Sequence, residues 1–327
     1  MKAIVRQQYG GPEQLLLEEV PDPVAGSGEV LVRVRAFGIN RAEQYLRRGL
    51  WGEVAPISGI ECVGEVVHDP NGGLLAAQRV FALMGGMGRT RNGSYAELVA
   101  VPAPNVVPIR STLDWAQLAA IPESYATAWS CLFDNLSLTR GDVILIRGAT
   151  SALGLAALDL ARYAQAKVVA TVRTAEGAPA ARNHGADEVL VDGSELENGL
   201  KHIAPHGVDA VLDLIGTATL LESLRLTKRG GRVCVAGFLG GHEPIAAFDP
   251  LLHLPSGRHL SFFGSAFVYG TPEYPLTDIP FQRIVDLVEA GTLRAKPARS
   301  FDLEEIQQAH RVLDEGTAGG KMIVRVR

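Results

Sequence analysis

A short turn between an apolar strand and a helix is the first stretch of this chain whose residue types and spacing are suited to chemistry. The turn "GATSALG" (148–154) follows the run "VILIR" and opens the segment "LAALDLAR". A turn of this kind presents backbone N–H groups and the positive end of a helix to a pyrophosphate. Two of the expected glycines are absent, but small residues keep most of the room, and Ser151 adds a hydroxyl donor. The turn predicts a dinucleotide site formed by Gly148, Ala149, Ser151, Ala152, Leu153 and Gly154. The alternative is a plain turn between a strand and a helix.

The end of the next strand, "KVVATVRT" (167–174), indicates which dinucleotide is bound. An Asp or Glu at this point bonds the ribose 2′-hydroxyl of NAD(H) and repels a 2′-phosphate. This chain has Arg173 and Thr174 instead. A guanidinium holds phosphate through paired, charge-assisted hydrogen bonds, and a threonine hydroxyl can donate as well. The two residues predict NADPH as the cofactor, while a solvated arginine at a strand end remains the alternative for Arg173.

Alternating strands and helices are needed to position this turn. From about residue 114, apolar strand-like runs at 143–147, 167–172 and 188–191 alternate with helical segments such as 152–164. This alternation predicts right-handed βαβ units and a parallel sheet with helices on both faces. Residues 1–110 instead read as short strands separated by Gly- and Pro-containing turns, which is typical of a partly closed β-barrel. The last strand, "KMIVRVR", is expected to return to this first part.

Composition excludes several classes of protein. The 327 residues carry a net charge of −5 without a basic tract, so nucleic acid is not an expected partner. No apolar run reaches about 18 residues, and the start "MKAIVRQQYG" lacks the apolar core of a signal peptide, so we expect no membrane span and no secretion. The three cysteines are far apart and form no CxxC pair. A disulfide framework is therefore not expected, and a reducing cytoplasm fits.

Several motifs follow one another in order and at consistent spacing, among them "GEVLVRVRAFGINRAEQYLRRG", "GIECVGEVV", "GSYAELVAVP", "GDVILIRGATSALGLAALDLAR" and "GKMIVRV". Together they resemble one enzyme family nearly from end to end. The chain is similar to the medium-chain dehydrogenase/reductase superfamily, in its zinc-free quinone oxidoreductase branch. The resemblance implies an α/β protein in which residues 1–120 and 266–327 form a GroES-like β-rich catalytic domain. It also implies a Rossmann NADP(H)-binding domain over 121–265, with the active site in the cleft between the two.

The resemblance also bears on zinc. In the zinc alcohol dehydrogenases of the superfamily, a Cys, a His and a Cys hold the catalytic metal, and the matching positions here are Asn40, Ile60 and Glu123. Isoleucine cannot bind a metal, and zinc prefers thiolate and imidazole ligands to Asn and Glu. The structural zinc lobe is replaced by "MGGMGRTRNGS", which has no cysteine. We therefore expect no metal.

Without a metal to polarise an alcohol, reduction is the easier direction. A hydride from the nicotinamide would move to an already electrophilic carbon, such as that of a quinone or an α,β-unsaturated carbonyl compound. The resemblance places Asn40 and Tyr45 in the catalytic cleft. Asn40 is then expected to bond the substrate carbonyl, and Tyr45 to bond the same oxygen or relay a proton. Trp51 is expected to form an aromatic wall for a ring substrate, with ordinary packing as the alternative for both aromatic residues.

Further cofactor contacts are implied by the resemblance alone. They lie near the start of the Rossmann domain and at the ends of its later strands: Thr127, Ile215, Gly216, Gly237, Phe238, Phe263, Gly264 and Ser265. The family often has a Lys soon after the second strand and a Tyr at the end of the third for the 2′-phosphate. This chain has Gly177, and Asp192 or Gly193, in those regions. The preference for NADPH therefore depends on Arg173.

The apolar run "LSFFGSAFVYG" (260–270) predicts a strand near a sheet edge. Pairing of two copies across a two-fold axis would cover it, so we expect a homodimer through residues 260–269, with a buried core strand as the alternative. The expected partner of the site is a small-molecule substrate. Two other functions remain open: an enoyl reductase or dehydrogenase acting on a larger acyl substrate, and a non-catalytic NADPH-binding regulatory protein.

Overall fold

The computed structural model describes residues 1–327. The chain divides into two compact units. The β-rich unit contains residues 1–126, 265–291 and 295–327, and the parallel-sheet unit contains residues 127–264 and 292–294. Each unit has its own sheet and its own hydrophobic core, so each is described by itself.

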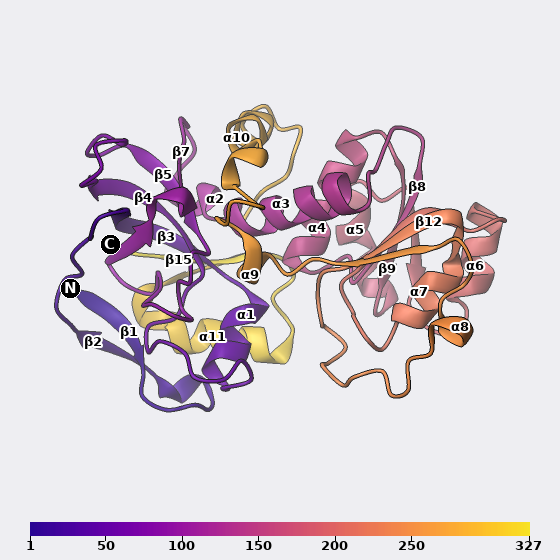
Figure 1. The fold of residues 1–327 in the computed structure, drawn as a ribbon, viewed down its shortest axis with the longest axis horizontal. Helices are drawn as coiled ribbons and strands as arrows, with labels where there is room; N and C mark the ends of the chain where they lie inside the picture. Colours follow the sequence, from indigo (N-terminus) through magenta and orange to yellow (C-terminus); the bar gives the residue numbers. More distant parts are fainter. The chain divides into compact units, whose positions relative to one another are not determined.

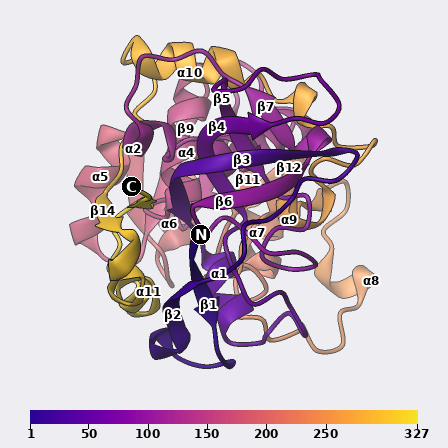
Figure 2. The same cartoon turned by 90° about the vertical axis from the view of Figure 1, so that its left-hand side faces the viewer.

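The β-rich unit is built around one mixed sheet, whose strands cross the front of Figure 2. Its strand order is β14-β15-β3-β4-β5-β7, with β6 paired to β3, while β1 and β2 form a separate antiparallel pair. The last strand of the chain pairs with β3, as expected, because β15 runs antiparallel to it from Met322 opposite Ile39. The strands are β1 (Lys2–Arg6), β2 (Leu15–Glu19), β3 (Glu29–Ile39), β4 (Glu61–His68), β5 (Arg79–Leu83), β6 (Leu98–Pro102), β7 (Val106–Pro108), β14 (Arg299–Asp302) and β15 (Met322–Arg325).

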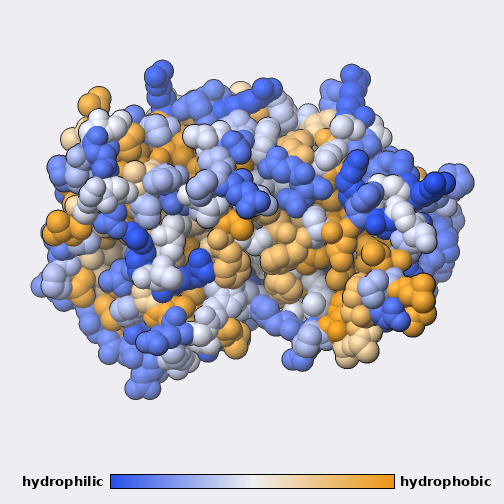
Figure 3. All heavy atoms as spheres, in the orientation of Figure 1, coloured by the Kyte–Doolittle hydropathy of each residue, from blue (hydrophilic) through white to orange (hydrophobic).

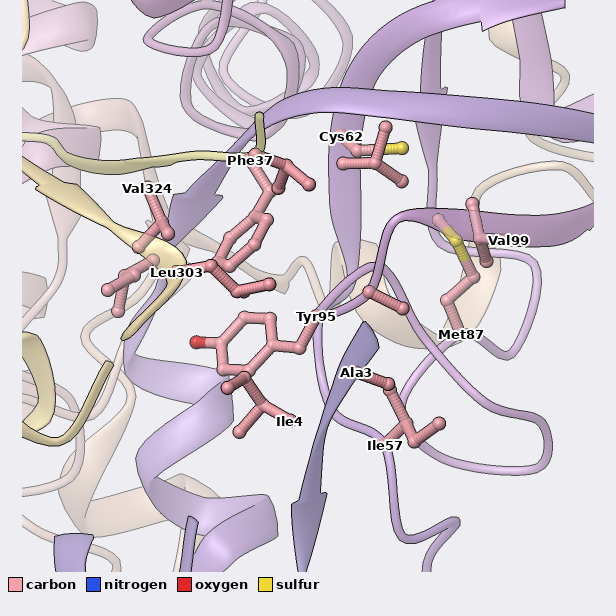
Figure 4. Packing of buried hydrophobic residues seen from close by; sticks show 14 of the residues in the cluster. Ala3, Ile4, Phe37, Ile57, Cys62, Met87, Tyr95, Val99, Leu303 and Val324 are labelled. Carbon is pink, nitrogen blue, oxygen red and sulfur yellow. The ribbon is translucent and has the colours of Figure 1, made fainter. Parts of the chain in front are cut away.

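The core of this unit joins both ends of the chain (Figure 4). Phe37 of β3 stacks on Tyr95 with ring centroids 4.5 Å apart, and Leu303 and Val324 from the C-terminal segment lie in the same cluster. Burial of such apolar side chains is the main favourable term in folding. The helices that begin in the unit are α1 (Arg41–Arg47), α2 (Trp115–Leu118), α3 (Pro122–Trp129), α9 (Ser265–Val268), α10 (Phe281–Glu289) and α11 (Ile306–Glu315).

The parallel-sheet unit confirms the predicted alternation of strands and helices. Its six strands lie in the order β10-β9-β8-β11-β12-β13, and every pair is parallel. The strands are β8 (Val143–Arg147), β9 (Lys167–Val172), β10 (Glu188–Val191), β11 (Val208–Asp213), β12 (Thr227–Val235) and β13 (His259–Phe262). Figure 1 shows the helices that accompany them: α4 (Ala152–Tyr163), α5 (Ala178–Asn183), α6 (Leu196–Ile203), α7 (Leu220–Leu226) and α8 (Pro250–His253).

One face of this sheet packs on α6 and α7, because Leu145 of β8 and Val169 of β9 share a buried cluster with Leu200 and Leu224 of those helices. Side chains alternate along a strand with period two. The odd-numbered residues at or next to the ends of these strands, Arg147 and Thr171, therefore continue the same face. This face is where the polar residues discussed below gather.

The structure corrects the predicted strand at 260–269. Strand β13 ends at Phe262, and the helical turn α9 begins at Ser265. A continuous apolar run does not distinguish a strand from a helical turn by periodicity, and Gly264 separates the two here. The position of β13 at the edge of the sheet is as expected. Helix α2 ends at Leu118 and α3 starts at Pro122, because proline is tolerated in the first turn of a helix but not in its interior.

Candidate cofactor and substrate sites

The carboxyl ends of the parallel strands meet at one edge of the sheet. Arg147 of β8 pairs with Asp213 of β11, which pairs with Val235 of β12, which in turn pairs with Phe262 of β13. The loops after these strands are therefore neighbours, and a ligand of an open parallel sheet binds at this edge. The structure brings together here the predicted cofactor residues Gly148, Ala149, Ser151, Ala152, Leu153, Gly154, Ile215, Gly216, Gly237, Phe238, Phe263 and Gly264.

The turn after β8 requires its two remaining glycines. Gly148 has φ +75°, and a Cβ there would lie 2.9 Å from a methyl carbon of Leu239. A Cβ on Gly154 would lie 2.6 Å from the carbonyl oxygens of both Gly148 and Ala149, because the first turn of α4 lies directly over the loop. Small residues thus allow backbone N–H groups to approach a ligand closely. The turn and the twelve-residue helix α4 behind it fit a pyrophosphate.

Ser151 has a different role from the added donor that the sequence predicts. It caps α4: its Oγ accepts from the N–H of Gly154 at 3.1 Å and donates to the carbonyl oxygen of Gly148 at 2.9 Å. Its only hydroxyl proton is therefore used inside the turn. Serine is a preferred N-cap because its oxygen satisfies an N–H that has no partner in the helix. The backbone N–H groups remain as the donors for a phosphate.

Arg173 and Thr174 follow β9 and are exposed, which suits contact with a 2′-phosphate. Val172 pairs with Val191, and the N–H of Asp192 donates to the carbonyl oxygen of Val172 at 2.9 Å. Arg173 and Asp192 thus follow the paired residues of neighbouring strands. The hydroxyl of Thr174 donates to Glu176 and lowers the pKa of that carboxyl. Arg173 is therefore accompanied by two carboxylates, Glu176 three residues later and Asp192 after the neighbouring strand. The sequence predicted only the positive charge at this point.

A buried arginine lies behind this edge. Arg147 is fully buried on the face of the sheet toward α7, where it pairs with Asp192 and with Glu222 at 2.8 Å. Its Nη1 donates to the hydroxyl of Ser223 at 3.2 Å, and Thr171 donates to Asp192 at 2.8 Å. The carboxylate of Asp192 is therefore held in place and partly neutralised. These contacts make Arg147 the source of compensating positive charge at the edge.

In the β-rich unit, Asn40 starts the short helix α1. Its N–H donates to Glu43 at 2.7 Å, and the other oxygen of Glu43 accepts from the N–H of Ile60 at 3.1 Å. Glu43 is fully buried, and burial raises the pKa of this carboxyl to about 7 in spite of these hydrogen bonds. The loop that carries Asn40 and the start of β4 are thus tied together through one carboxyl group.

The side chain of Asn40 belongs to a second buried group. Lys321 donates to Oε1 of Glu61 at 2.5 Å and to Oδ1 of Asn40, while Nδ2 of Asn40 donates to the same Glu61 oxygen at 2.9 Å. The second oxygen of Glu61 accepts from the backbone N–H of Glu123 at 2.8 Å. Close packing leaves no room for a side chain at Gly38, whose Cβ would lie 2.3 Å from Glu61. These contacts fix which end of the Asn40 amide presents an N–H group.

The three positions that match metal ligands in the zinc dehydrogenases lie around this group. Asn40 bonds Lys321, Ile60 bonds Glu43 through its backbone, and Glu123 bonds Glu61 through its backbone. A buried ammonium opposes the entry of a divalent cation, and isoleucine offers no ligand. The residues at these positions therefore do not fit a catalytic zinc ion.

Tyr45 and Trp51 belong to an aromatic series in the same unit. Their ring centroids lie 5.7 Å apart, and Trp51 lies 5.4 Å from Phe267 of α9. The guanidinium of Arg89 lies over the ring of Phe267 at 4.7 Å. Burial raises the pKa of Tyr45, so its hydroxyl keeps its proton at neutral pH. We call Tyr45, Trp51 and Phe267 the aromatic series, and Arg89 lies at its Phe267 end.

Thr127 and Ser265 are buried and lie at two of the four points where the chain passes from one unit to the other. Sequence reasoning missed Lys321, Glu61, Arg147, Phe267 and Arg89. A signal was present for the first three, since each is a charged residue next to or within an apolar strand, in "GKMIVRV", "GIECVGEVV" and "VILIR". Charged side chains in such places are buried only when paired. No comparable signal marks Phe267 or Arg89.

Comparison with known proteins gives consistent results. Residues 26–111 match the alcohol dehydrogenase GroES-like domain, and residues 184–324 match the zinc-binding dehydrogenase family. Quinone oxidoreductase from Mus musculus is 31% identical over 99% of this chain and 97% of its own length. A crystal structure of an NAD-dependent alcohol dehydrogenase is 26% identical, with a TM-score of 0.83 over all of both chains. The structure of Escherichia coli quinone oxidoreductase complexed with NADPH covers 99% of this chain and 100% of its own, with a TM-score of 0.88 and 23% identity, which supports the fold.

No helix in residues 1–327 is long and apolar enough to span a membrane.

The β-rich unit is the GroES-like domain and the parallel-sheet unit the Rossmann domain that the motifs imply. Because both family matches agree with a quinone oxidoreductase that is 31% identical over nearly the whole chain, this protein is an oxidoreductase that uses a nicotinamide cofactor, and it belongs to the quinone oxidoreductase branch of the medium-chain dehydrogenase/reductase superfamily.

Proposed function

We propose that this enzyme is a zinc-independent, NADPH-dependent reductase of quinones or α,β-unsaturated carbonyl compounds. The observation that carries the proposal is the group formed by Asn40, Glu61 and Lys321 at the positions of the metal ligands. An alcohol needs a Lewis acid or base to lose its proton, whereas an activated alkene or quinone needs only a donor to its carbonyl oxygen. The mouse relative is a quinone oxidoreductase and the Escherichia coli structure holds NADPH, and both agree with this choice.

NADPH supplies the hydride when it is bound. The turn at Gly148 and the start of α4 would hold its pyrophosphate, and Arg173 its 2′-phosphate. Asn40 has one N–H directed to Glu61, and its second N–H would donate to the carbonyl oxygen of the substrate. Because Lys321 donates to the amide oxygen, it polarises the amide and strengthens that donor. Tyr45 would donate a proton to the same oxygen.

The cofactor assignment is tested by titrating the protein with NADPH and with NADH, followed by fluorescence. A charge-assisted contact to the 2′-phosphate is worth about 1.5–3 kcal/mol, which is about ten- to a hundredfold in affinity. Arg173→Ala should remove a preference of that size, while Arg182→Ala, also an exposed arginine of this unit, should leave it unchanged. Equal affinity of the unaltered protein for the two cofactors would contradict the assignment.

The reaction is tested by turnover of 1,4-naphthoquinone and of a simple enone with NADPH. Asn40→Ala and Tyr45→Phe should lower kcat while the affinity for NADPH stays the same, because neither residue belongs to the parallel-sheet unit. Treatment with a strong chelator should leave the rate unchanged. Loss of activity on chelation, restored by zinc, would show that the enzyme depends on a metal. A protein that binds NADPH but reduces no acceptor would instead favour a regulatory role.

We also propose that two copies of the chain associate through β13. This strand is the edge of its sheet, and it exposes Leu260 and 57% of Phe262. Leu251 of α8 is 88% exposed, and Figure 3 shows apolar surface over the region where Figure 1 places α8. An unpaired edge strand with apolar side chains is normally covered. Phe262→Asp should give a monomer in sedimentation analysis, whereas Leu75→Asp, at an exposed site of the β-rich unit, should not.

A further inference from the structure

Three arginines of the β-rich unit lie over aromatic rings, and one of them differs from the other two. Arg6 lies over Tyr9 and donates to the carbonyl oxygen of Val54, and Arg79 lies over Trp115 and donates to backbone carbonyls as well. The guanidinium of Arg89 lies over Phe267 and has no hydrogen bond or carboxylate partner within the protein. A half-buried guanidinium offers five N–H donors, so this one has unused capacity for an acceptor.

The position of Arg89 is fixed by its backbone. Its N–H donates to the carbonyl oxygen of Gly86 at 3.0 Å, and its own carbonyl oxygen accepts from the N–H of Ala55 at 2.8 Å. Glu53, two residues before Ala55, is exposed and makes no ion pair with it. Partial burial lowers the pKa of Arg89, which leaves its charge intact at neutral pH. A fixed, charged and unpaired guanidinium is suited to an anion that comes from outside the chain.

The aromatic series connects Arg89 with the proposed reaction. The rings run from Phe267 through Trp51 to Tyr45, and Tyr45 lies on α1, the helix that Asn40 caps. Flat conjugated molecules pack well against such rings, and 55% of Phe267 is exposed to receive one. A ligand lying along the series would meet the donors of α1 at one end and a cation at the other.

We propose that the acceptor reduced by this enzyme carries an anionic group, such as a carboxylate or sulfonate, and that Arg89 binds it. The flat part of the acceptor lies against Trp51 and Phe267. Arg89 is thus a specificity-determining residue that selects anionic acceptors over neutral ones of the same shape. The inference rests on the proposed reductase function.

The test compares two acceptors, 1,4-naphthoquinone and 1,4-naphthoquinone-2-sulfonate, in the unaltered enzyme and in Arg89→Gln and Arg89→Lys. The quantity of interest is kcat/KM for the sulfonate divided by kcat/KM for the neutral quinone. Because the same two compounds are used throughout, their difference in reduction potential cancels between variants. Arg89→Gln should lower the ratio about tenfold or more, Arg89→Lys should lower it less, and the affinity for NADPH should not change.

Arg110→Gln serves as the matched control, because Arg110 is an exposed arginine of the same unit that contacts Gln282 through its backbone only. An unchanged ratio in Arg89→Gln would overturn the inference, and so would an equal change in Arg110→Gln, since the effect would then reflect net charge. High salt should reduce the ratio in the unaltered enzyme and much less in Arg89→Gln.

If the unaltered enzyme reduces neither quinone, the reductase proposal fails, and binding alone tests Arg89. Quenching of tryptophan fluorescence would then be followed with 2-naphthoate and with 2-naphthol. Trp51 is one of three tryptophans in the chain, and Trp51→Phe identifies its share of the signal. Tighter binding of 2-naphthoate that Arg89→Gln removes would support the anion site. Equal binding of both compounds in both proteins would overturn it.

Discussion

Lys321 of the β-rich unit and Arg147 of the parallel-sheet unit are both buried cations, and their surroundings differ. Lys321 in the β-rich unit lies against Glu61, which is itself fully buried. Arg147 in the parallel-sheet unit is also buried, but the side chains of its partners Asp192 and Glu222 are 17% and 30% exposed to solvent. The first pair is enclosed within the fold, whereas the second reaches from the interior to the edge where the loops after the parallel strands meet.

This difference indicates what each cation does. An enclosed pair gains little net stability, because both charges lose their hydration, but it can hold neighbouring groups in one arrangement. Lys321 and Glu61 do this for the amide of Asn40. A pair with one end near water mainly sets local charge, and Arg147 does this for Asp192 beside Arg173. The following experiments test this contrast, beginning with the largest expected effect.

Lys321→Met should be the most damaging substitution, because it leaves Glu61 charged, buried and without its counter-ion. Breaking a buried pair from one side costs about 3–5 kcal/mol. Urea denaturation followed by circular dichroism measures the loss. The double variant Lys321→Met/Glu61→Gln should regain a large part of it, since no charge is then left unpaired. A single variant as stable as the unaltered protein would show that Glu61 takes up a proton or that water reaches the pair.

The regained stability should not restore the reaction. In the double variant the amide of Asn40 loses the cation at its oxygen, so kcat should remain low although the protein is folded. If kcat recovers together with stability, Lys321 acts only in folding, and its proposed effect on Asn40 is wrong.

Glu43 should make stability depend on pH in a defined direction. Burial raises its pKa in the folded protein from 4.5 to about 7, so the folded state binds the proton more tightly than the unfolded state does. The stabilisation from this site is complete below pH 4.5 and is lost as the pH rises to about 7, with a slope of at most about 1.4 kcal/mol per pH unit. Denaturation midpoints of Glu43→Gln across this range should fall less steeply. Parallel curves for the two proteins would contradict the raised pKa.

Arg147→Met should have a smaller effect on stability than Lys321→Met, because water can reach the carboxylates that it leaves behind. A loss of about 1–3 kcal/mol is expected. The variant should also bind NADPH less well relative to NADH, because Asp192 would then repel the 2′-phosphate. Asp192→Asn should shift the cofactor ratio the opposite way. If both variants keep the original ratio of affinities, charge at Asp192 does not reach the cofactor.

Sequence patterns predicted the elements well and the polar contacts poorly. The strands at 143–147, 167–172 and 188–191 have the predicted bounds, because the apolar runs that fill a parallel sheet are local in sequence. Lys321 and Glu61 are 260 residues apart, and only the pairing of β15 with β3 brings them together. Ser151 was expected to face a ligand but caps its own helix, since both uses suit a serine at that position. Local patterns thus indicated where a candidate site lies, and tertiary pairing determines which contacts its side chains make.

An exposed pair completes the comparison and should show the smallest effect. Lys201 and Glu197 lie 2.9 Å apart on α6, four residues from each other, and both are largely exposed. Water and salt screen such a pair, and ordering two long side chains offsets the attraction. Lys201→Ala should therefore leave the denaturation midpoint and the cofactor ratio unchanged within error. Because this substitution also removes one positive charge from the parallel-sheet unit, it separates the effect of net charge from that of location. If Lys201→Ala changed the ratio of the affinities for NADPH and NADH as much as Arg147→Met does, the effect would come from net charge. The position of Arg147 behind the edge of the sheet would then not explain it.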